Sequence, residues 1–307
     1  MRTDHEPSTS HVDREIRHQP RAWASALDLL PALSPLLPQP GERVAVIGCG
    51  TSWFMAAAYA STRELSGAGE TDAFAASQFP AGRRYDRVVA ISRSGTTTEV
   101  VRAIDATRAP VLAITAVHDS PVEAAADDTV VLDFADEQSV VQTVFATTVL
   151  ILLRGSLGED LAPVIAQAQA VLAGGTSYPA ELEQVEQLTF LGQDWAFGIA
   201  QEAALKMREA AQGWTEAYPQ MEYRHGPIAI AQPGRAVWVF GRPVDGLVAD
   251  LAATGALVVA DPLDPVADLV RAQLLAVRRA RAQHLEPDRP RHLTRSVVLG
   301  EDVRPGR

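Results

Sequence analysis

The fold is decided by the stretch Val88-Val89-Ala90-Ile91-Ser92-Arg93-Ser94-Gly95-Thr96-Thr97-Thr98-Glu99. An apolar run of strand type ends in hydroxyl residues around one glycine, and a helical pattern follows. A strand that stops at the start of a helix leaves unpaired backbone N–H groups pointing outward, and hydroxyl side chains there add donors. Gly95 lets the backbone close around a ligand. The stretch therefore predicts an anion site, and phosphate is the expected ligand.

The same order of strand, glycine–hydroxyl turn and helix occurs one unit earlier. Residues 43–52 form a buried-type strand that ends in Gly48-Cys49-Gly50-Thr51-Ser52, and residues 53–65 predict an alanine-rich helix. Apolar strands that alternate with helices indicate a parallel sheet covered on both faces. Ligands of such sheets bind beyond the carboxyl ends of the strands, where both turns point. Further elements of this half are expected as strands at 72–75, 110–115 and 128–132 and as a buried helix at 140–153.

The second half of the chain repeats this organisation at low resolution. Residues 188–193 predict a strand that runs into a glycine, and residues 196–212 predict a long helix. Later strands are expected at 237–240 and 256–260, and a last helix at 264–282. We expect an internal duplication, with its boundary near Gly174-Gly175-Thr176-Ser177. At the N-terminus, Pro20 is expected to separate a short helix from a second one, after a disordered tail over residues 1–12.

Composition excludes several classes of protein. The chain has 307 residues, 47% of them hydrophobic and 21% charged, as in an ordinary globular protein. A formal net charge of −11 argues against a nucleic-acid surface. Cys49 is the single cysteine, which excludes a disulfide framework and a cysteine-rich zinc site. There is no signal-peptide pattern and no apolar run long enough for a bilayer, so we expect a cytoplasmic protein without membrane contact. We expect no metal and no cofactor.

The helix expected at 196–212 holds an unusual group of charges. Glu202, Lys206 and Glu209 follow one another at i, i+4 and i+7 and therefore share one face of the helix. One interpretation is an exposed, stabilising Glu–Lys pair. The other is a carboxylate held beside an ammonium in a cleft, where it can transfer protons. The pattern alone leaves both open.

A polar, aromatic loop is expected after this helix, over residues 214–219 and 222–227. His225 lies in it between an arginine and a Gly-Pro pair. A lone histidine is more often structural than catalytic. A histidine in an irregular loop after a glutamate-bearing helix is nevertheless a candidate for proton transfer.

These motifs together resemble those of sugar isomerase (SIS) domain proteins. The chain is similar in particular to the isomerase half of glucosamine-6-phosphate synthase and to amino-sugar-phosphate isomerase/deaminases. The matching runs lie in the expected order from residue 15 to near the C-terminus. They are Glu15-Ile16…Gln19-Pro20, Gly48–Ser52, Ser92–Thr97, Glu137-Gln138-Ser139-Val140, Glu202–Glu209, Glu222-Tyr223-Arg224-His225-Gly226-Pro227 and Pro290-Arg291-His292-Leu293-Thr294-Arg295-Ser296-Val297.

The resemblance implies an α/β fold with two tandem SIS domains, each a five-stranded parallel sheet in an αβα sandwich. The first domain, with N-terminal helices, would cover residues 13–173 and the second residues 174–285. Residues 286–307 would form a C-terminal tail that completes the active site. The resemblance also implies a homodimer with shared active sites and a small sugar phosphate as partner.

The resemblance further assigns roles to individual residues. Glu209 would move the proton between C1 and C2 of the sugar, with Glu202 and Lys206 supporting it. His225, often donated by the neighbouring subunit in this family, would open the sugar ring. The expected phosphate contacts are Ser92, Ser94 and Thr97, and the other expected substrate-binding residues are Thr51, Ser52, Arg93, Val140 and Arg295.

Three departures from the synthase pattern qualify these roles. No glutaminase domain precedes the isomerase part, so this chain is not expected to make ammonia from glutamine. Arg295 stands where the synthases have a lysine that engages the sugar carbonyl, and arginine does not form a Schiff base. Arg93 replaces an uncharged residue and is expected to add a bidentate phosphate donor, the alternative being an exposed arginine beside the loop.

We therefore expect an enzyme that acts on a phosphorylated amino sugar or its ketose. The reaction would be aldose–ketose isomerisation through an enediol or enediolamine, with or without release or addition of ammonia. Two alternatives stay open. One is a deglycase that splits fructosyl-amine phosphates, with the aromatics of residues 214–221 lining a larger pocket. The other is a non-catalytic sugar-phosphate sensor, with which the arginine at 295 is compatible.

Overall fold

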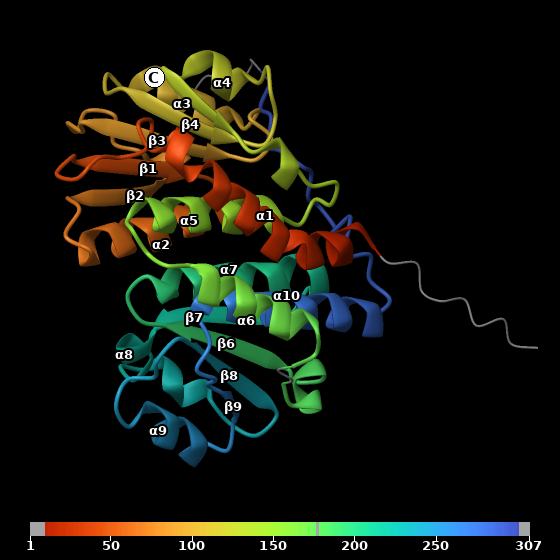
Figure 1. Ribbon diagram of the computed structural model, residues 1–307. Coiled ribbons are helices and arrows are strands. Elements are labelled where there is room, and N and C mark those ends of the chain that lie inside the picture. Colours follow the sequence, from red (N-terminus) through yellow and green to blue (C-terminus); the bar gives the residue numbers. More distant parts are fainter. Residues whose placement is uncertain (1–9, 176–177, 301–307) are drawn as a thin grey trace, which may run out of the picture.

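The computed structural model of the chain describes residues 10–175 and 178–300, and its strands form two parallel sheets (Figure 1). The first sheet has five strands in the order β2-β1-β3-β4-β5, as the sequence predicts for the first half. All of its strand pairs are parallel, with Ile47 opposite Ala90 and Ser92 opposite Thr115. Its strands are β1 (Val44–Gly48), β2 (Thr71–Ala75), β3 (Arg87–Ser92), β4 (Val111–Thr115) and β5 (Asp128–Val131).

The second sheet orders its strands as the first sheet orders its first four, but it has one strand fewer than expected. Within the described residues it contains four strands, in the order β7-β6-β8-β9. The expectation of five strands is wrong for the described residues, because residues 283–300, after the last helix, carry no strand. This segment turns back across the first half as an extended tail instead. The strands are β6 (Gln187–Gly192), β7 (Trp214–Pro219), β8 (Arg235–Phe240) and β9 (Leu257–Val259).

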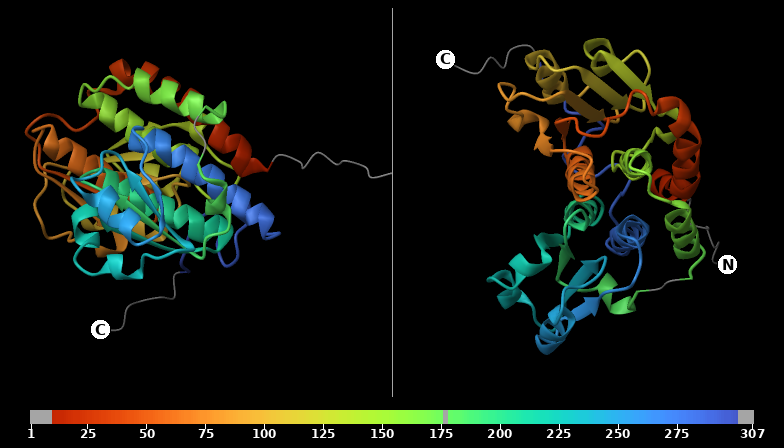
Figure 2. Two further views of the ribbon diagram at one scale, coloured as in Figure 1. Left: turned by 90° about the horizontal axis from the view of Figure 1, so that it is seen from below. Right: turned by 60° about the vertical axis from the view of Figure 1, so that its left-hand side comes forward.

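Helices lie between the sheets and on their outer faces (Figure 2). Two helices cover the outer face of the first sheet, α3 (Thr98–Ala106) and α4 (Pro121–Ala125). The outer face of the second sheet carries α8 (Gln220–Tyr223) and α9 (Leu247–Ala253). The helices between the sheets are α1 (His11–Leu33), α2 (Thr51–Leu65), α5 (Val144–Ser156), α6 (Ala162–Leu172), α7 (Ala196–Ala211) and α10 (Pro265–Ala282).

The largest hydrophobic cluster lies among these inner helices and includes residues from both halves of the chain. Trp23 and Phe145 from the first half and Phe190 and Trp238 from the second are fully buried in it. Burial of such side chains supplies the main favourable free energy of folding. The two halves therefore share one core, and the domain division near residue 173 stays a prediction. Thr176 and Ser177, part of the expected boundary, lie outside the described residues.

The N-terminal helix differs from the expectation. Residues 1–9 lie outside the described residues, but α1 begins at His11, so a disordered tail through residue 12 is wrong. One helix also continues through Pro20 instead of breaking there. The reason is tertiary: Ile16, Trp23 and Ala26 pack on one face of α1 with no exposed surface, and this burial outweighs the hydrogen bond that proline removes. Ser10 caps the helix by accepting a hydrogen bond from the Asp13 N–H.

The segment expected as an aromatic loop is mostly regular structure. Residues 214–219 form β7, an edge strand that pairs along its whole length with β6, and α8 follows it at once. Leu188 of β6 lies opposite Thr215, and Gly192 lies opposite Pro219. Pairing with the buried strand β6 fixes the extended conformation of this segment, and its polar composition does not predict a strand. None of the described helices combines the length and apolar content needed to cross a membrane.

Candidate active site

The two hydroxyl-rich turns lie at the carboxyl edge of the first sheet, where β1 and β3 end side by side. Both turns depend on a glycine. A Cβ on Gly48 would overlap the backbone of Ser52, because the start of α2 packs directly on the strand end. Gly95 has a φ of +65°, and a Cβ there would approach Ser120 Oγ to 2.3 Å. Glycine thus allows both the left-handed turn and the close approach of the loop to the next turn.

The hydroxyl groups after β3 belong to residues 92–97, the stretch predicted to bind an anion, which we call the cradle. Ser92 is buried, and its Oγ has no hydrogen-bond partner within the described chain. Ser94 Oγ accepts hydrogen bonds from the Thr96 N–H (3.2 Å) and Thr96 Oγ1 (3.0 Å). Thr97 precedes α3 as its N-cap residue, without a side-chain capping bond. The unpartnered hydroxyl of Ser92 and the side chain of Thr97, which caps no N–H, are groups that a bound oxyanion could use.

Arg93 is placed differently from the expectation. Its side chain is buried, which excludes the exposed alternative, and it does not lie free for a phosphate. The guanidinium donates to the backbone carbonyls of Ser139 (3.0 Å), Val140 (3.4 Å) and Arg295 (3.0 Å). The Glu137 carboxylate lies 3.9 Å away. Arg93 thus ties the cradle to the 136–143 loop and to the C-terminal tail, because five N–H donors in a fixed fork suit several carbonyls at once.

The C-terminal tail lies directly on the cradle. Thr96 Oγ1 and Ser296 Oγ share a hydrogen bond of 2.9 Å. The Thr98 N–H, at the start of α3, donates to the Val297 carbonyl at 3.2 Å, and the Leu299 N–H donates to Thr98 Oγ1 at 2.9 Å. Residues 296–299 of the tail therefore pack against the cradle, and the role of the tail in completing an active site stays a prediction. Ser296 adds a hydroxyl to the cradle that the sequence did not single out.

Arg295 does not point its charge at a sugar carbonyl in this arrangement. Its guanidinium contacts the carboxylate of Asp136 and the backbone carbonyl of Glu137. Its own carbonyl accepts the hydrogen bond from Arg93. The residue thus anchors the tail at both its side chain and its backbone. The tail is fixed further upstream, where the Asp288 carboxylate accepts the N–H groups of His11 and Val12 at 2.8 Å each.

The charged group of α7 is buried, so the interpretation as an exposed pair is wrong. Glu202 and Lys206 each expose 1% of their side chains, and the Lys206 ammonium lies 3.4 Å from Glu202 Oε1. The ammonium also donates to Thr51 Oγ1 at 3.0 Å, in the first turn of α2, and contacts the Glu209 carboxylate. Glu209 retains 18% exposure. The buried ammonium of Lys206 therefore links Thr51, in the turn after β1, to both glutamates of α7.

The burial of this cluster shifts its proton affinities. Desolvation raises the pKa of Glu202 to about 8, against the opposing effect of the Lys206 charge. Burial also disfavours the charged ammonium, but the carboxylates of Glu202 and Glu209 outweigh it and raise the pKa of Lys206. Lys206 therefore stays a cation near neutral pH. Glu209, the least buried member, has a fixed cationic partner and access to the outside.

Glu137 is a buried carboxylate to which sequence reasoning assigned no role. Its oxygens accept the N–H groups of Val144 (2.8 Å) and Phe145 (3.2 Å) at the start of α5, as well as that of Thr143. Desolvation raises its pKa, while Arg93 opposes the shift. Its charge also acts on Lys206. Glu137 therefore links the cradle electrostatically to the α7 cluster, and a glutamate shortly before a long apolar helix was the available signal.

His225 does not join this cluster within one chain. β7 runs from Trp214, beside the end of α7, to Pro219, which lies opposite Gly192 at the start of α7. His225 follows α8 at that far edge and is exposed. Glu209 lies thirteen residues along α7 from Ala196, so it lies about 20 Å away along the helix axis at 1.5 Å per residue. His225 is therefore remote from Glu209 of its own chain.

The remaining predicted residues are at the edges of the site. Ser52 is buried in the first turn of α2. The Val140 carbonyl accepts from Arg93, and its N–H donates to the Asp288 carbonyl at 3.0 Å, so both backbone groups are engaged. No group of three or more His, Cys, Asp or Glu side chains in residues 10–175 and 178–300 is arranged to hold a metal ion.

Comparisons with known proteins show what parts of the chain are similar to. Residues 37–156 match the family model of the SIS domain. The chain is 29% identical to the glutamine–fructose-6-phosphate aminotransferase (isomerizing) of Pyrobaculum aerophilum, over 70% of this chain and 44% of that protein. It is 27% identical to the enzyme of the same name from Sulfurisphaera tokodaii, over 93% of this chain and 56% of that protein. The chain thus spans about half the length of these curated relatives.

The fold also has a close counterpart among solved structures. The crystal structure of glucosamine-6-phosphate deaminase from Thermotoga maritima superposes with a TM-score of 0.80 at 24% sequence identity. The match covers 94% of this chain and 100% of the other. At this identity the likeness shows a shared fold. The shared fold includes both sheets of the present chain, beyond the segment that the family model matches.

Proposed function

We propose that this chain, which carries a SIS domain and is homologous to the isomerase domain of glutamine–fructose-6-phosphate aminotransferases, isomerises an amino-sugar phosphate or its ketose. The reaction would interconvert aldose and ketose through an enediol or enediolamine, with or without deamination or amination. Such chemistry requires a base that removes a proton next to a carbonyl and returns it to the neighbouring carbon.

The buried contact between Lys206 and Glu209 is the observation that carries this proposal. A partly exposed carboxylate beside a fully buried ammonium can meet a substrate while its charge stays paired, which is the arrangement expected of a proton-transfer group. Thr51 orients the ammonium at 3.0 Å. Glu209 therefore acts as the base that shuttles the proton between C1 and C2, and Lys206 and Glu202 position and polarise it.

The cradle would hold the phosphate of the substrate. Ser92, Ser94 and Thr97 lie at the end of β3, and Ser52 lies in the adjoining turn after β1. In a chain with a formal net charge of −11, an anion must be bound by local donors, and hydroxyl groups at a helix start supply them. Arg93 supports this loop through the backbone of the tail, so its contribution to phosphate binding is indirect.

The remaining parts of the proposal concern assembly. His225 would open the sugar ring in the active site of a second copy of the chain, since it lies far from Glu209 of its own chain. The second sheet would be a second SIS unit, because its strands β7-β6-β8-β9 follow the same order as β2-β1-β3-β4. A homodimer in which each chain supplies His225 to the other chain's site is the simplest closed assembly that allows this.

One observation favours a second candidate function. Residue 295 of the tail carries a guanidinium, which forms no Schiff base, and Asp136 engages it, so this residue presents no amine to a sugar carbonyl. A non-catalytic sugar-phosphate sensor would need the cradle and the tail but no tail amine. The deglycase alternative is favoured less, because Trp214 lies on the edge strand β7 under Arg235 and not in a loop that lines a pocket.

A ligand screen followed by product assays tests the proposal. Hexose and hexosamine 6-phosphates are compared by thermal shift, and a ligand at 100 times its Kd should stabilise the fold by about 2.7 kcal/mol. Each binder is then assayed for its isomer and for released ammonia. Isomer formation supports the isomerase, and ammonia supports deamination. Binding without turnover supports the sensor, and no stabilisation at millimolar ligand contradicts both functions.

A further inference from the structure

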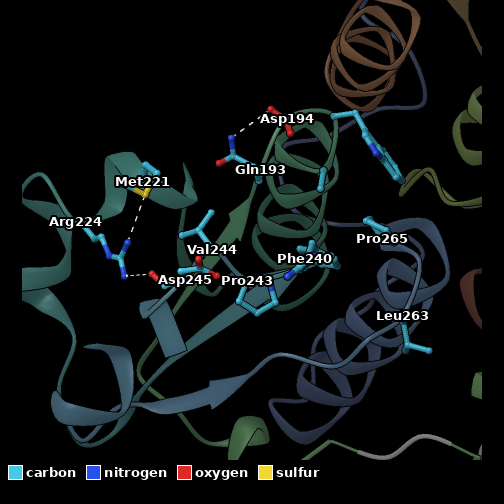
Figure 3. A pocket seen from close by; sticks show the side chains of 14 residues that line it. Gln193, Asp194, Met221, Arg224, Phe240, Pro243, Val244, Asp245, Leu263 and Pro265 are labelled. Carbon is cyan, nitrogen blue, oxygen red and sulfur yellow. Dashed lines mark hydrogen bonds between the residues drawn. The ribbon is translucent and has the colours of Figure 1, made fainter. Parts of the chain in front are cut away.

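A cavity lies at the carboxyl edge of the second sheet, far from the candidate active site (Figure 3). It has a volume of about 860 Å³, within the range of sites for small metabolites. Its walls come from residues 193–196 after β6, residues 240–245 after β8, and the residues around α8 and the start of α10. Glu209 lies at the opposite end of α7, so this cavity is separate from the α7 cluster.

The place of the cavity in the sheet is the one where open α/β sheets bind ligands. From β6 the chain moves through α7 to β7 on one side, and β8 then pairs on the other side of β6. The strand order therefore reverses between β6 and β8, and the crevice beyond such a reversal is the general ligand site. The cradle of the first sheet occupies the equivalent position between β1 and β3.

The local backbone of the first site is repeated here, but its chemistry is not. Like Gly48, Gly192 ends its strand where a Cβ would overlap the start of the next helix, and Gly241, like Gly95, has a positive φ (+72°). The hydroxyl groups of the cradle have no counterpart in Gly241-Arg242-Pro243-Val244-Asp245. This cavity thus has the same backbone turns as the cradle, but its side chains are different.

The walls are held rigidly. Gln220 is fully buried; its amide donates to the Arg242 carbonyl at 3.1 Å and accepts from the Val244 N–H at 2.7 Å, which fixes the loop after β8. Arg224 donates to Asp250 at 2.9 Å and to the Asp245 carbonyl at 2.9 Å. These bonds fix the loop before any ligand binds, which reduces the entropy lost on binding.

The free charges of the lining have both signs. Arg224 is neutralised by Asp250. The guanidinium of Arg242 is exposed and has no hydrogen bond or ion pair within the described residues. Asp194 and Asp245 are also exposed; the Asp194 carboxylate accepts only from Gln193 at 3.2 Å, and no ion pair neutralises either carboxylate in the described chain. Between these charges the wall is apolar, with Trp195, Pro243, Leu263 and Pro265.

We propose that this cavity binds a zwitterionic metabolite that carries an oxyanion group and a primary amine. Arg242 would pair with the oxyanion, and Asp194 and Asp245 with the ammonium. Charge complementarity favours such a ligand, because an anion alone meets two carboxylates and a cation alone meets the guanidinium. Amino-sugar phosphates belong to this class, but the inference holds for the cavity whether or not the chain catalyses a reaction.

Titration calorimetry tests the proposal with three matched probes. Glucosamine 6-phosphate carries both charged groups, glucose 6-phosphate lacks the amine, and glucosamine lacks the phosphate. All titrations use the Glu209→Gln background, so that no probe is consumed. We expect two equivalents of glucosamine 6-phosphate per chain. At the cavity, either probe that lacks one of the two charged groups should bind at least about tenfold more weakly, which corresponds to about 1.4 kcal/mol.

Substitutions assign each equivalent to its site. Arg242→Glu should remove the cavity equivalent and leave the cradle equivalent, and Ser94→Ala should weaken only the cradle equivalent. Arg21→Glu, at an exposed position on α1, is the matched charge control and should change neither. The proposal is overturned if Arg242→Glu leaves the stoichiometry at two. It is equally overturned by a single equivalent that responds only to Ser94→Ala, or by cavity binding that is equal for all three probes.

Discussion

The Lys206 ammonium donates a 3.0 Å hydrogen bond to Thr51 Oγ1, across the contact between α7 and α2. Thr51 belongs to the turn after the first strand, and Lys206 lies 155 residues later in the chain. This bond joins the glycine–hydroxyl motif of the first half to the charged helix of the second half. It fixes the position of Glu209, whose carboxylate contacts the same ammonium.

Replacing Glu209 with glutamine should abolish turnover but not binding. The amide has the shape of the carboxylate and cannot take a proton, so we expect a loss in kcat of about 10²- to 10⁴-fold. The ligand-induced thermal shift should stay within a degree or two, since phosphate contacts are made elsewhere. Glu222→Gln, on the exposed side of α8, is the matched control. Unchanged turnover in Glu209→Gln would rule out this residue as the base.

Two inactive variants should complement each other in a mixed dimer. If Glu209 and His225 of one site come from different chains, Glu209→Gln and His225→Ala homodimers both lack complete sites. A mixed dimer then contains one intact site and one doubly altered site. Random exchange of equal amounts makes half of the dimers mixed, and each mixed dimer has one of its two sites intact. The mixture should therefore regain about one quarter of the wild-type activity. Activity that stays at the level of the parent variants after subunit exchange would show that the site is not shared.

The stability of the chain should depend on the protonation of Glu202. Its pKa is raised from an ordinary 4.5 to about 8 by burial, so the folded state retains the proton better than the unfolded state does. This contribution to stability is full below pH 4.5 and is lost as the pH rises toward 8. Glu202→Gln removes the titrating group, so its denaturant midpoint should fall less steeply over this pH range. Parallel pH profiles for the two proteins would contradict the assignment.

Arg93→Gln should release the C-terminal tail. The guanidinium donates to the carbonyls of Ser139, Val140 and Arg295, and glutamine reaches fewer of them. Trypsin should then cleave faster after the tail arginines, Arg291 among them, as measured by mass spectrometry. Arg87→Gln is a control at a half-buried arginine bound to Glu42. A variant with an unchanged cleavage rate but weaker binding of inorganic phosphate would show that Arg93 is a direct phosphate ligand after all.

Gly95→Ala should destabilise the fold more than alanine at another left-handed glycine. Both Gly95 (φ +65°) and Gly158 (φ +86°) have a positive φ, but only Gly95 has an atom near the position of a Cβ. Backbone strain should cost each variant about 1–2 kcal/mol. The overlap with Ser120 adds about 1–3 kcal/mol at Gly95 alone. Denaturant unfolding of both variants measures the difference, and equal losses would show that the 119–121 turn yields at no cost.

The alternation of apolar runs, glycine turns and helical patterns was sufficient to predict most elements of the fold. β1, β3 and β4 were predicted within one residue of their bounds, because buried central strands read as continuous apolar runs. The pattern failed at α1 and β7. Pro20 and the polar residues of 214–219 have local preferences that packing against the core and pairing with β6 override.

The sequence by itself determined the parallel sheets, the two glycine turns and the shared face of Glu202, Lys206 and Glu209, because these follow from spacing along a regular element. Only the tertiary structure decided that this face is buried against Thr51, that Arg93 supports the tail, and that His225 is remote from Glu209. Those relationships join residues tens to hundreds of positions apart. Local periodicity carries no information about them, since burial and long-range hydrogen bonding are set by how the two sheets and their helices pack.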